Sequence, residues 1–168
     1  MASARLLIVD DEVNVRSALR RSLRKTSHQL SFADSGEAAL EILEREEVDI
    51  VMSDQLMPGM SGVQLLRAVR LRKPYVARIM LTGHADLDTA MDGVRSGDID
   101  RFLTKPWDDL ELRAVLEMAC EKLAAESENR RLLAALRAED PARAGEAAAS
   151  GRREGGEVGK AGGRDRTR

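Results

Sequence analysis

The sequence predicts an α/β fold, with a doubly wound, five-stranded parallel sheet that is covered by helices on both faces. Five short apolar segments alternate along the chain with five segments whose apolar residues recur at helical spacing. Strand–helix–strand connections of this kind are right-handed and build a parallel sheet. At 168 residues, the chain has room for one such domain and an appendage.

The first elements follow from the apolar pattern. Residues 5–9 form an apolar run between polar neighbours, which is typical of a buried strand. At 13–23 the apolar residues fall largely on one helical face. A second short strand is predicted at 29–33, and Asp34 with Glu37 forms a capping-box pattern that opens the second helix.

The third strand is predicted at 48–53. The loop that follows contains proline and glycine within residues 57–60, which predicts a turn. Ser61 and Gln64 repeat the capping-box pattern and open a third helix. That helix ends before Pro74, because the residue preceding a proline disfavours the helical conformation.

Two further strand–helix units complete the sheet. The fourth strand is predicted at 76–81, and the next helix runs from Asp86 until Gly97 closes it. The fifth strand is predicted at 100–104, and a long last helix begins after Pro106.

Composition changes toward the end of the chain. We expect the α/β domain to occupy residues 4–122 and the last helix to continue as an extension over 123–138. A coiled coil is not favoured there, because a strict heptad would place Glu126 and Arg130 in its seam. Residues 139–168 are rich in Gly, Ala, Arg and Glu, which predicts a disordered tail.

Charge and cysteine content limit the partners and the location. The formal net charge is −2, so composition predicts neither a nucleic acid nor an anionic membrane surface as partner. The single cysteine, Cys120, excludes an internal disulfide and fits a reducing cytosol. No segment has the roughly 18 consecutive apolar residues of a membrane span, and the first apolar run is too short for a signal peptide. We therefore expect a cytoplasmic protein.

Reactive polar groups stand at the ends of four predicted strands: Asp10 with Asp11, Asp54, Thr82 and Lys105. The carboxyl ends of parallel strands share one edge of the sheet, so these groups are expected to line one crevice. Like charges about 4 Å apart repel by roughly 4 kcal/mol at an effective dielectric of 20, so the acidic cluster needs a positive partner. Oxygen-only ligands favour Mg²⁺ or Mn²⁺.

The order and spacing of these groups resemble the receiver domain of bacterial response regulators. The similarity covers roughly residues 5–122. The residues that carry it are Asp10-Asp11, Asp54 with Pro58 four residues on, Thr82-Gly83, and Phe102-Leu103-Thr104-Lys105-Pro106. The resemblance implies a flavodoxin-like (βα)5 fold with strand order 2-1-3-4-5. Taken singly, an acidic pair can cap a helix and a lysine can be a surface residue, but their joint placement favours a site.

The resemblance also implies a role for each site residue. Asp54 corresponds to the phosphoacceptor, which takes a phosphoryl group from a phosphohistidine. Asp11 and Asp54 are expected to bind Mg²⁺ directly, Asp10 through a water molecule, and Leu56 through its backbone carbonyl. Lys105 is expected to contact the phosphoryl oxygens.

A conformational switch is implied by the same resemblance. The Thr82 hydroxyl moves toward the new phosphoryl group, and the ring of Phe102 moves inward behind it. Tyrosine is frequent at the ring position in the family, and Phe102 lacks the hydroxyl on which an output through that group would rest. Leu56 and His84 are expected to flank the path of an attacking water, and the Lys105–Pro106 bond is expected to be cis.

These features predict a phosphoacceptor response regulator of a two-component system. It receives its phosphoryl group from a histidine kinase or phosphotransfer protein and signals to an unknown downstream protein by conformational switching. It catalyses only its own phosphorylation and dephosphorylation, so we do not class it as an enzyme. A weak or phosphorylation-dependent homodimer is left open.

Three alternatives remain at this point. In the first, the chain is an intermediate that passes phosphate onward in a phosphorelay. In the second, it is a docking module that works without phosphorylation. The third is a magnesium-dependent phosphohydrolase that acts through an aspartyl phosphate. Such an enzyme needs a second acid two residues after its nucleophile, where Leu56 stands.

Overall fold

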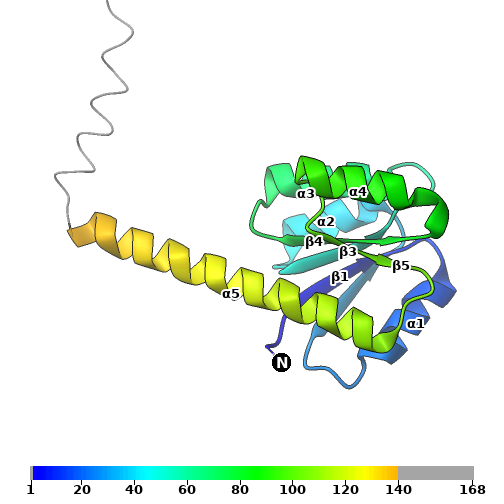
Figure 1. Ribbon diagram of the computed structural model, residues 1–168, viewed down its shortest axis with the longest axis horizontal. Coiled ribbons are helices and arrows are strands. Elements are labelled where there is room, and N and C mark those ends of the chain that lie inside the picture. Colours follow the sequence, from blue (N-terminus) through cyan, green and yellow to red (C-terminus); the bar gives the residue numbers. More distant parts are fainter. Residues whose placement is uncertain (1, 140–168) are drawn as a thin grey trace, which may run out of the picture. The chain divides into compact units, whose positions relative to one another are not determined.

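The computed structural model describes residues 2–139. The described residues up to Glu126 form one compact unit, and residues 127–139 belong to a second unit. The first unit alternates strands and helices along its whole length (Figure 1). The elements are β1 (Arg5–Val9), α1 (Val13–Leu23), β2 (Gln29–Ala33), α2 (Gly36–Arg45), β3 (Ile50–Asp54), α3 (Gly62–Arg72), β4 (Ala77–Thr82), a short 3-10 helix (His84–Asp86), α4 (Leu87–Ser96), β5 (Arg101–Thr104) and α5 (Asp109–Glu139).

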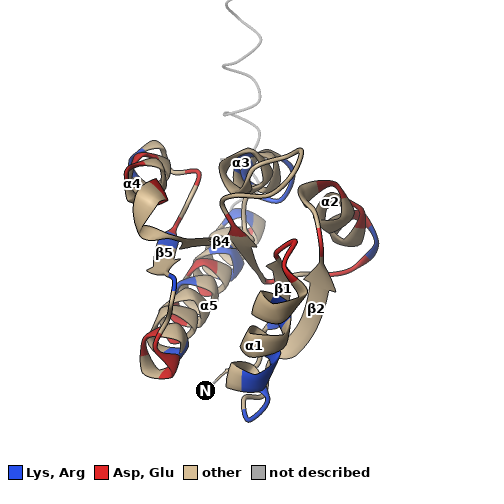
Figure 2. Ribbon diagram, turned by 90° about the vertical axis from the view of Figure 1, so that its right-hand side faces the viewer, with Lys and Arg blue, Asp and Glu red and all other residues tan. Residues whose placement is uncertain are grey.

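The five strands of the described chain form one sheet in the order β2-β1-β3-β4-β5, and every pair is parallel. The predicted fold class and strand order are therefore confirmed. Figure 2 views the sheet nearly along its strands, with α1 and the start of α5 on one face and α2, α3 and α4 on the other. The strand order reverses direction between β1 and β3, which is where ligands bind in sheets of this type.

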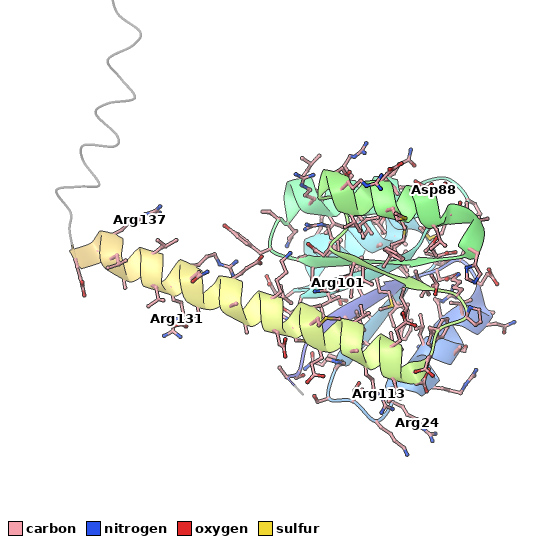
Figure 3. All side chains as sticks on the ribbon, viewed as in Figure 1. Arg24, Asp88, Arg101, Arg113, Arg131 and Arg137 are labelled. Carbon is pink, nitrogen blue, oxygen red and sulfur yellow. The ribbon has the colours of Figure 1, made fainter. Side chains whose placement is uncertain are left out.

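Two apolar cores lie on the two faces of the sheet. Side chains alternate along each strand, so Leu6 and Ile8 of β1 pack under α1 and α5, while Leu7 and Val9 pack under α2 and α3. Both faces of β1, β3 and β4 are covered, which explains why their sequences are continuous apolar runs. By contrast, charged side chains at the surface, such as Arg24, point away from the sheet (Figure 3).

Two of the predicted helix signals are confirmed. Ser61 Oγ accepts a hydrogen bond from the Gln64 amide at 3.3 Å, and Gln64 Oε1 accepts from the Ser61 amide at 3.0 Å, which completes the capping box of α3. Gly97 ends α4 with a φ of 81°, a left-handed conformation that favours glycine.

The capping box predicted for the second helix is wrong. Ser35, not Asp34, is the N-cap of α2, and its hydroxyl accepts a hydrogen bond from the Ala38 amide at 3.1 Å. The Glu37 carboxylate accepts from the Met60 amide at 3.3 Å instead of folding back on the cap. Asp and Ser cap helices about equally well, so tertiary contacts decided which of the two neighbours does so.

Strand limits differ from the predictions by a residue or two. The third strand begins at Ile50 instead of residue 48. Asp49, directly before it, accepts a hydrogen bond on its carboxylate from the Arg5 amide at 2.7 Å. The third strand also includes Asp54, and β4 includes Thr82. Both of these site residues are therefore held in regular strand geometry.

The end of the described chain belongs to α5. Residues 123–138 lie within this helix, and Glu139, which we assigned to the tail, is its last residue. The rest of the predicted tail, 140–168, lies outside the described residues. Between residues 2 and 139, no helix is both long enough and apolar enough to cross a membrane.

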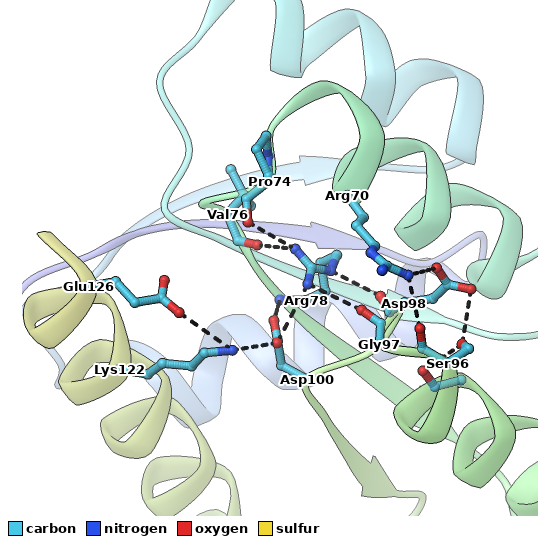
Figure 4. Close-up of polar contacts among 11 residues, drawn as sticks. Arg70, Pro74, Val76, Arg78, Ser96, Gly97, Asp98, Asp100, Lys122 and Glu126 are labelled. Atoms are coloured by element: carbon cyan, nitrogen blue, oxygen red, sulfur yellow. Dashed lines mark hydrogen bonds and ion pairs between the residues drawn. The ribbon is translucent and has the colours of Figure 1, made fainter. Parts of the chain in front are cut away.

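A buried ionic network joins β4 to the loop before β5. Arg78 of β4 is 6% exposed, and its guanidinium donates to the backbone carbonyls of Asp98 at 3.0 Å and Val76 at 2.9 Å (Figure 4). It also forms an ion pair with Asp100 at 3.5 Å. Lys122 of α5 binds the same Asp100 carboxylate at 2.7 Å. The network therefore connects β4 and the loop before β5 with the last helix.

Asp98 anchors the other side of this network. Its side chain is 5% exposed, and it accepts hydrogen bonds from Arg67 and Arg70 of α3, both at 3.0 Å. Ser96 Oγ donates to the same carboxylate at 3.1 Å. Burial raises the pKa of Asp98, but the hydrogen bonds from Arg70, Arg67 and Ser96 outweigh it and hold the pKa below its ordinary value. The sequence analysis did not predict this network.

Candidate functional site

The site lies where the central strands end. Asp54 is the last residue of β3, and Asp10 directly follows β1; they are 6% and 0% exposed. Val9 and Ser53 are partners in the parallel ladder, so the next residue of each strand places the two carboxylates side by side. Figure 2 shows the acidic segment that follows β1 at this edge of the sheet.

A third acid, Glu12, joins the pair. Carboxylate oxygens of Asp10, Glu12 and Asp54 lie within 4.8 Å of one another. Asp11, the ligand expected from the resemblance, is exposed and is not in this group. The Glu12 amide donates to Asp10 Oδ1 at 2.9 Å, so the chain turns sharply after β1 and brings residue 12 back beside residue 10.

The sequence analysis missed Glu12, although a signal was present. It is the N-cap of α1, where acids are favoured, and it directly follows an acidic pair. Its side chain makes no capping hydrogen bond to the helix. The carboxylate is therefore free for another role, which only the turn geometry reveals.

Lys105 supplies the cation of the cluster. Its ammonium Nζ lies 3.2 Å from Asp10 Oδ2 and 3.1 Å from Asp54 Oδ1. The Lys105 amide donates to the Thr82 carbonyl at 2.8 Å, which continues the β4–β5 ladder by one residue. The Lys105–Pro106 peptide bond is cis, as the resemblance implied. Three carboxylates and one ammonium leave the site with an excess of negative charge.

Burial and neighbouring charges shift the pKa values of both Asp54 and Lys105. Burial raises the pKa of Asp54, the ammonium of Lys105 opposes this, and the neighbouring Asp10 adds to the rise, so the pKa lies above its usual range. Burial alone would lower the pKa of Lys105, but the hydrogen bond to Asp54 and the charges of Asp10 and Asp54 outweigh it. Lys105 is therefore held in its charged form.

Two of the other predicted residues lie at the ends of β4 and β5. Thr82 is fully buried, and its hydroxyl donates to the Gly83 carbonyl at 3.2 Å. Its predecessor in β4 pairs with Asp54, which places Thr82 next to the carboxylate cluster. Phe102 of β5 is half-buried and packs against the core under α2, α3 and α4.

The two residues expected to flank the site are exposed. Leu56 has 66% of its surface exposed, and His84 lies in the exposed 3-10 helix after β4. Both stand in loops that follow the strand ends carrying Asp54 and Thr82. The structure thus leaves them at the rim of the cluster rather than inside it.

The start of α3 packs directly on the end of β3. A Cβ atom added at Gly62 would overlap the Asp54 carbonyl oxygen. Only glycine permits this approach, because any other residue would push the helix away from the strand. The start of α3 is thereby held against the end of β3.

Comparison with known proteins identifies the family. The model of the response regulator receiver domain matches residues 6–117, which run from the second residue of β1 through the other four strands to the beginning of α5. The chain therefore belongs to the response regulator receiver domain family, the class of domain used by two-component systems. The resemblance read from Asp54 and its surroundings is confirmed at this level.

Curated relatives are similar over the same region. The hydrogenase transcriptional regulatory protein HoxA of Cupriavidus necator is 34% identical over 138 residues, which are 82% of this chain and 28% of that protein. The response regulator protein FleR of Pseudomonas aeruginosa is 39% identical over 116 residues, 69% of this chain and 24% of that protein. The chain thus spans about a quarter of the length of these relatives.

Solved structures share the fold. The signal receiver domain of an HD domain-containing protein from Pseudomonas fluorescens aligns with a TM-score of 0.70 and 35% identity, covering 74% of this chain and 99% of that one. A structure described as adenylate cyclase from Rhodopirellula baltica aligns with a TM-score of 0.74 and 31% identity, covering 79% and 98%.

Proposed function

We propose that this receiver domain accepts a phosphoryl group on Asp54 from a histidine kinase or phosphotransfer protein and signals to a downstream protein. The observation that carries the proposal is the buried Asp54 carboxylate, 3.1 Å from the Lys105 ammonium in a cluster of further acids. Such a cluster costs stability by repulsion, so it is favoured only where its charge is used.

The donor set fits Mg²⁺ or Mn²⁺. The carboxylate oxygens of Asp10, Glu12 and Asp54 lie together, and no nitrogen or sulfur ligand accompanies them in this group. We propose Asp11 and the Leu56 carbonyl as further ligands on the basis of the family resemblance. When bound, the divalent ion supplies positive charge that offsets the carboxylates and the phosphoryl oxygens.

In the proposed reaction, a carboxylate oxygen of Asp54 attacks the phosphorus of a phosphohistidine. The phosphorus–nitrogen bond breaks, the imidazole leaves with the electron pair, and an acyl phosphate forms on Asp54. The transition state is loose, so this chain mainly contributes position and charge. The Lys105 ammonium, now paired with Asp54 and Asp10, contacts the phosphoryl oxygens.

The proposed switch uses Thr82 and Phe102. The Thr82 hydroxyl exchanges its bond to the Gly83 carbonyl for one to a phosphoryl oxygen. The half-buried Phe102 ring then moves inward and changes the surface formed by α4 and β5. Leu56 and His84 at the rim are proposed to control the approach of the water that later hydrolyses the acyl phosphate.

The decisive experiment is incubation with acetyl phosphate and Mg²⁺, followed by intact mass measurement. The wild type is expected to gain the mass of one phosphoryl group, and Asp54→Asn is expected to gain none. Asp88→Asn, a change on the exposed surface of α4, serves as the matched control and should behave as wild type. Equal uptake by wild type and Asp54→Asn would overturn the assignment.

A further inference from the structure

Gln55, which follows the phosphoacceptor, has a buried amide side chain that the proposed reaction does not use. Its surface is 9% exposed, which is unusual for glutamine. A buried polar group is expected to be hydrogen-bonded. Its partner therefore indicates what the side chain does.

The partner is the start of α3. Gln55 Oε1 accepts a hydrogen bond from the Val63 amide at 2.9 Å, and the Gln55 backbone carbonyl accepts from the Gly62 amide at 3.0 Å. These two amides are in the first turn of the helix, where intrahelical acceptors are lacking. Ser61 caps the third amide, that of Gln64. Gln55, which lies outside the helix, thus supplies the hydrogen-bond acceptors for two of the first three backbone amides of α3.

The same residue also orients the phosphoacceptor. The Gln55 amide donates to Asp54 Oδ1 at 2.9 Å, the oxygen that also faces Lys105. One residue therefore ties the Asp54 carboxylate to the first turn of α3. The loop between them contains Leu56, whose carbonyl is a proposed metal ligand, and the bonds of Gln55 to residues 62 and 63 close this loop at its base.

We infer that Gln55 is a positioning residue, whose side chain holds the loop after β3 in the geometry that binds the divalent cation. This inference rests on the proposed function, because it assumes that the cation binds beside Asp54. The side chain contacts neither the cation nor the phosphoryl group; it acts through Leu56 and Asp54. Residues that support metal ligands in this way change metal affinity without being ligands.

The test compares Gln55→Met with Gln64→Leu. Methionine keeps the length of glutamine but places no oxygen acceptor at the Val63 amide. Gln64→Leu removes a different cap from the same helix and leaves the loop closure intact, so it controls for a general weakening of α3. Gln55→Met is expected to weaken Mg²⁺ binding about tenfold by isothermal titration calorimetry. Gln64→Leu is expected to change it less than about twofold.

A second readout needs no metal. Amide hydrogen exchange at Val63 in the metal-free protein is expected to be slow in wild type, fast in Gln55→Met and slow again in Gln55→Glu, which restores an acceptor oxygen. Fast exchange in wild type, or equal Mg²⁺ affinities of Gln55→Met and Gln64→Leu, would overturn the inference. If the wild type takes up phosphate but these two variants bind Mg²⁺ equally, the proposed function stands and only the role of Gln55 is rejected.

Discussion

The charge balance of the site depends on one side chain. Lys105 pairs with both Asp54 and Asp10 at 3.1 and 3.2 Å, while a third carboxylate, that of Glu12, lies within 4.8 Å of the other two. The Lys105 ammonium offsets part of the repulsion among these carboxylates, and it faces the Asp54 oxygen that the proposed reaction uses. Removing the Lys105 side chain is therefore predicted to change both the equilibrium charge of Asp54 and the rate of the proposed phosphorylation.

Lys105→Met is predicted to slow phosphorylation by acetyl phosphate about a hundredfold, because one preorganised charge contact to the transferring group is lost. The same change should raise the pKa of Asp54 further above its usual range, since burial then acts without the opposing ammonium. Phosphorylation is followed by intact mass, and the pKa by NMR titration of the metal-free protein. Lys122→Met, which removes a lysine from the Asp100 network, is the control and should change neither quantity.

Glu12 is the acid that the resemblance did not indicate. If it contributes to the cation site, Glu12→Gln should weaken Mg²⁺ binding about tenfold while Asp54 remains able to accept phosphate at saturating Mg²⁺. Isothermal titration calorimetry measures the affinity, and Glu37→Gln on α2 is a control outside the cluster. Unchanged Mg²⁺ affinity in Glu12→Gln would show that the Glu12 carboxylate lies near the cation site without contributing to it.

At the scale of elements, the close contact of α3 with β3 determines the shape of the site. Gly62 lies against the Asp54 carbonyl, so a methyl group there would separate the helix from the strand. Gly83, at the end of β4, is a natural comparison, because a Cβ added there would meet no atom within 4 Å.

Gly62→Ala is therefore predicted to destabilise the fold by about 2 kcal/mol, the usual cost of overpacking. Gly83→Ala should be neutral or slightly stabilising, because its φ of −80° suits alanine. Urea unfolding of both variants checks the difference. Equal stabilities would mean that the start of α3 can move away from β3 without cost.

The network around Asp98 ties α3 to the loop before β5. Asp98→Asn is predicted to lower the free energy of unfolding by about 2 kcal/mol at neutral pH, since hydrogen bonds from Arg67 and Arg70 lose their ionic partner. The pKa of Asp98 is lower in the folded state than its ordinary value of 3.8. Its stabilising effect is thus complete above that value and is lost as the pH falls through the lower folded-state pKa.

Urea unfolding of wild type and Asp98→Asn at pH 7 and in the acid range measures this effect. The gap between the two proteins should narrow in the acid range, below the ordinary pKa of Asp98. Asp92→Asn, which removes an exposed ion pair with Arg95, should cost far less at any pH. A gap that is independent of pH would place the effect of Asp98→Asn in packing instead of charge.

At the scale of the whole molecule, cation binding at the acidic edge of the sheet is expected to affect both the stability and the proposed function. A ligand that binds only the folded state stabilises it by RT ln(1 + [L]/Kd), so the effect grows with the logarithm of the free ligand concentration once that exceeds Kd. Mg²⁺ is therefore predicted to raise the Tm of wild type, and EDTA to abolish both this rise and phosphate uptake. Differential scanning calorimetry checks the Tm. The same experiment on Asp54→Asn should show a smaller rise, because one carboxylate of the cluster is lost.

Local patterns in the sequence were sufficient to predict the α/β architecture. The apolar runs of β1, β3 and β4 reflect burial on both faces, and the alternation with helices determines a parallel sheet. Since parallel strands end at one edge, the convergence of Asp10, Asp54 and Lys105 followed from their places in the sequence. The strand order and the cis bond before Pro106 came from the family resemblance and not from these patterns.

Only the tertiary structure decided which side chains meet. Glu12, and not Asp11, lies with the buried acids, because a turn after β1 brings it back. Gln55 caps a helix that begins seven residues later, and Arg78 binds a carbonyl twenty residues away in the chain. Burial and periodicity are properties of short segments, whereas a hydrogen bond between distant residues depends on how the segments pack. The sequence therefore determines the fold and the reactive edge, and packing determines the exact set of groups that act there.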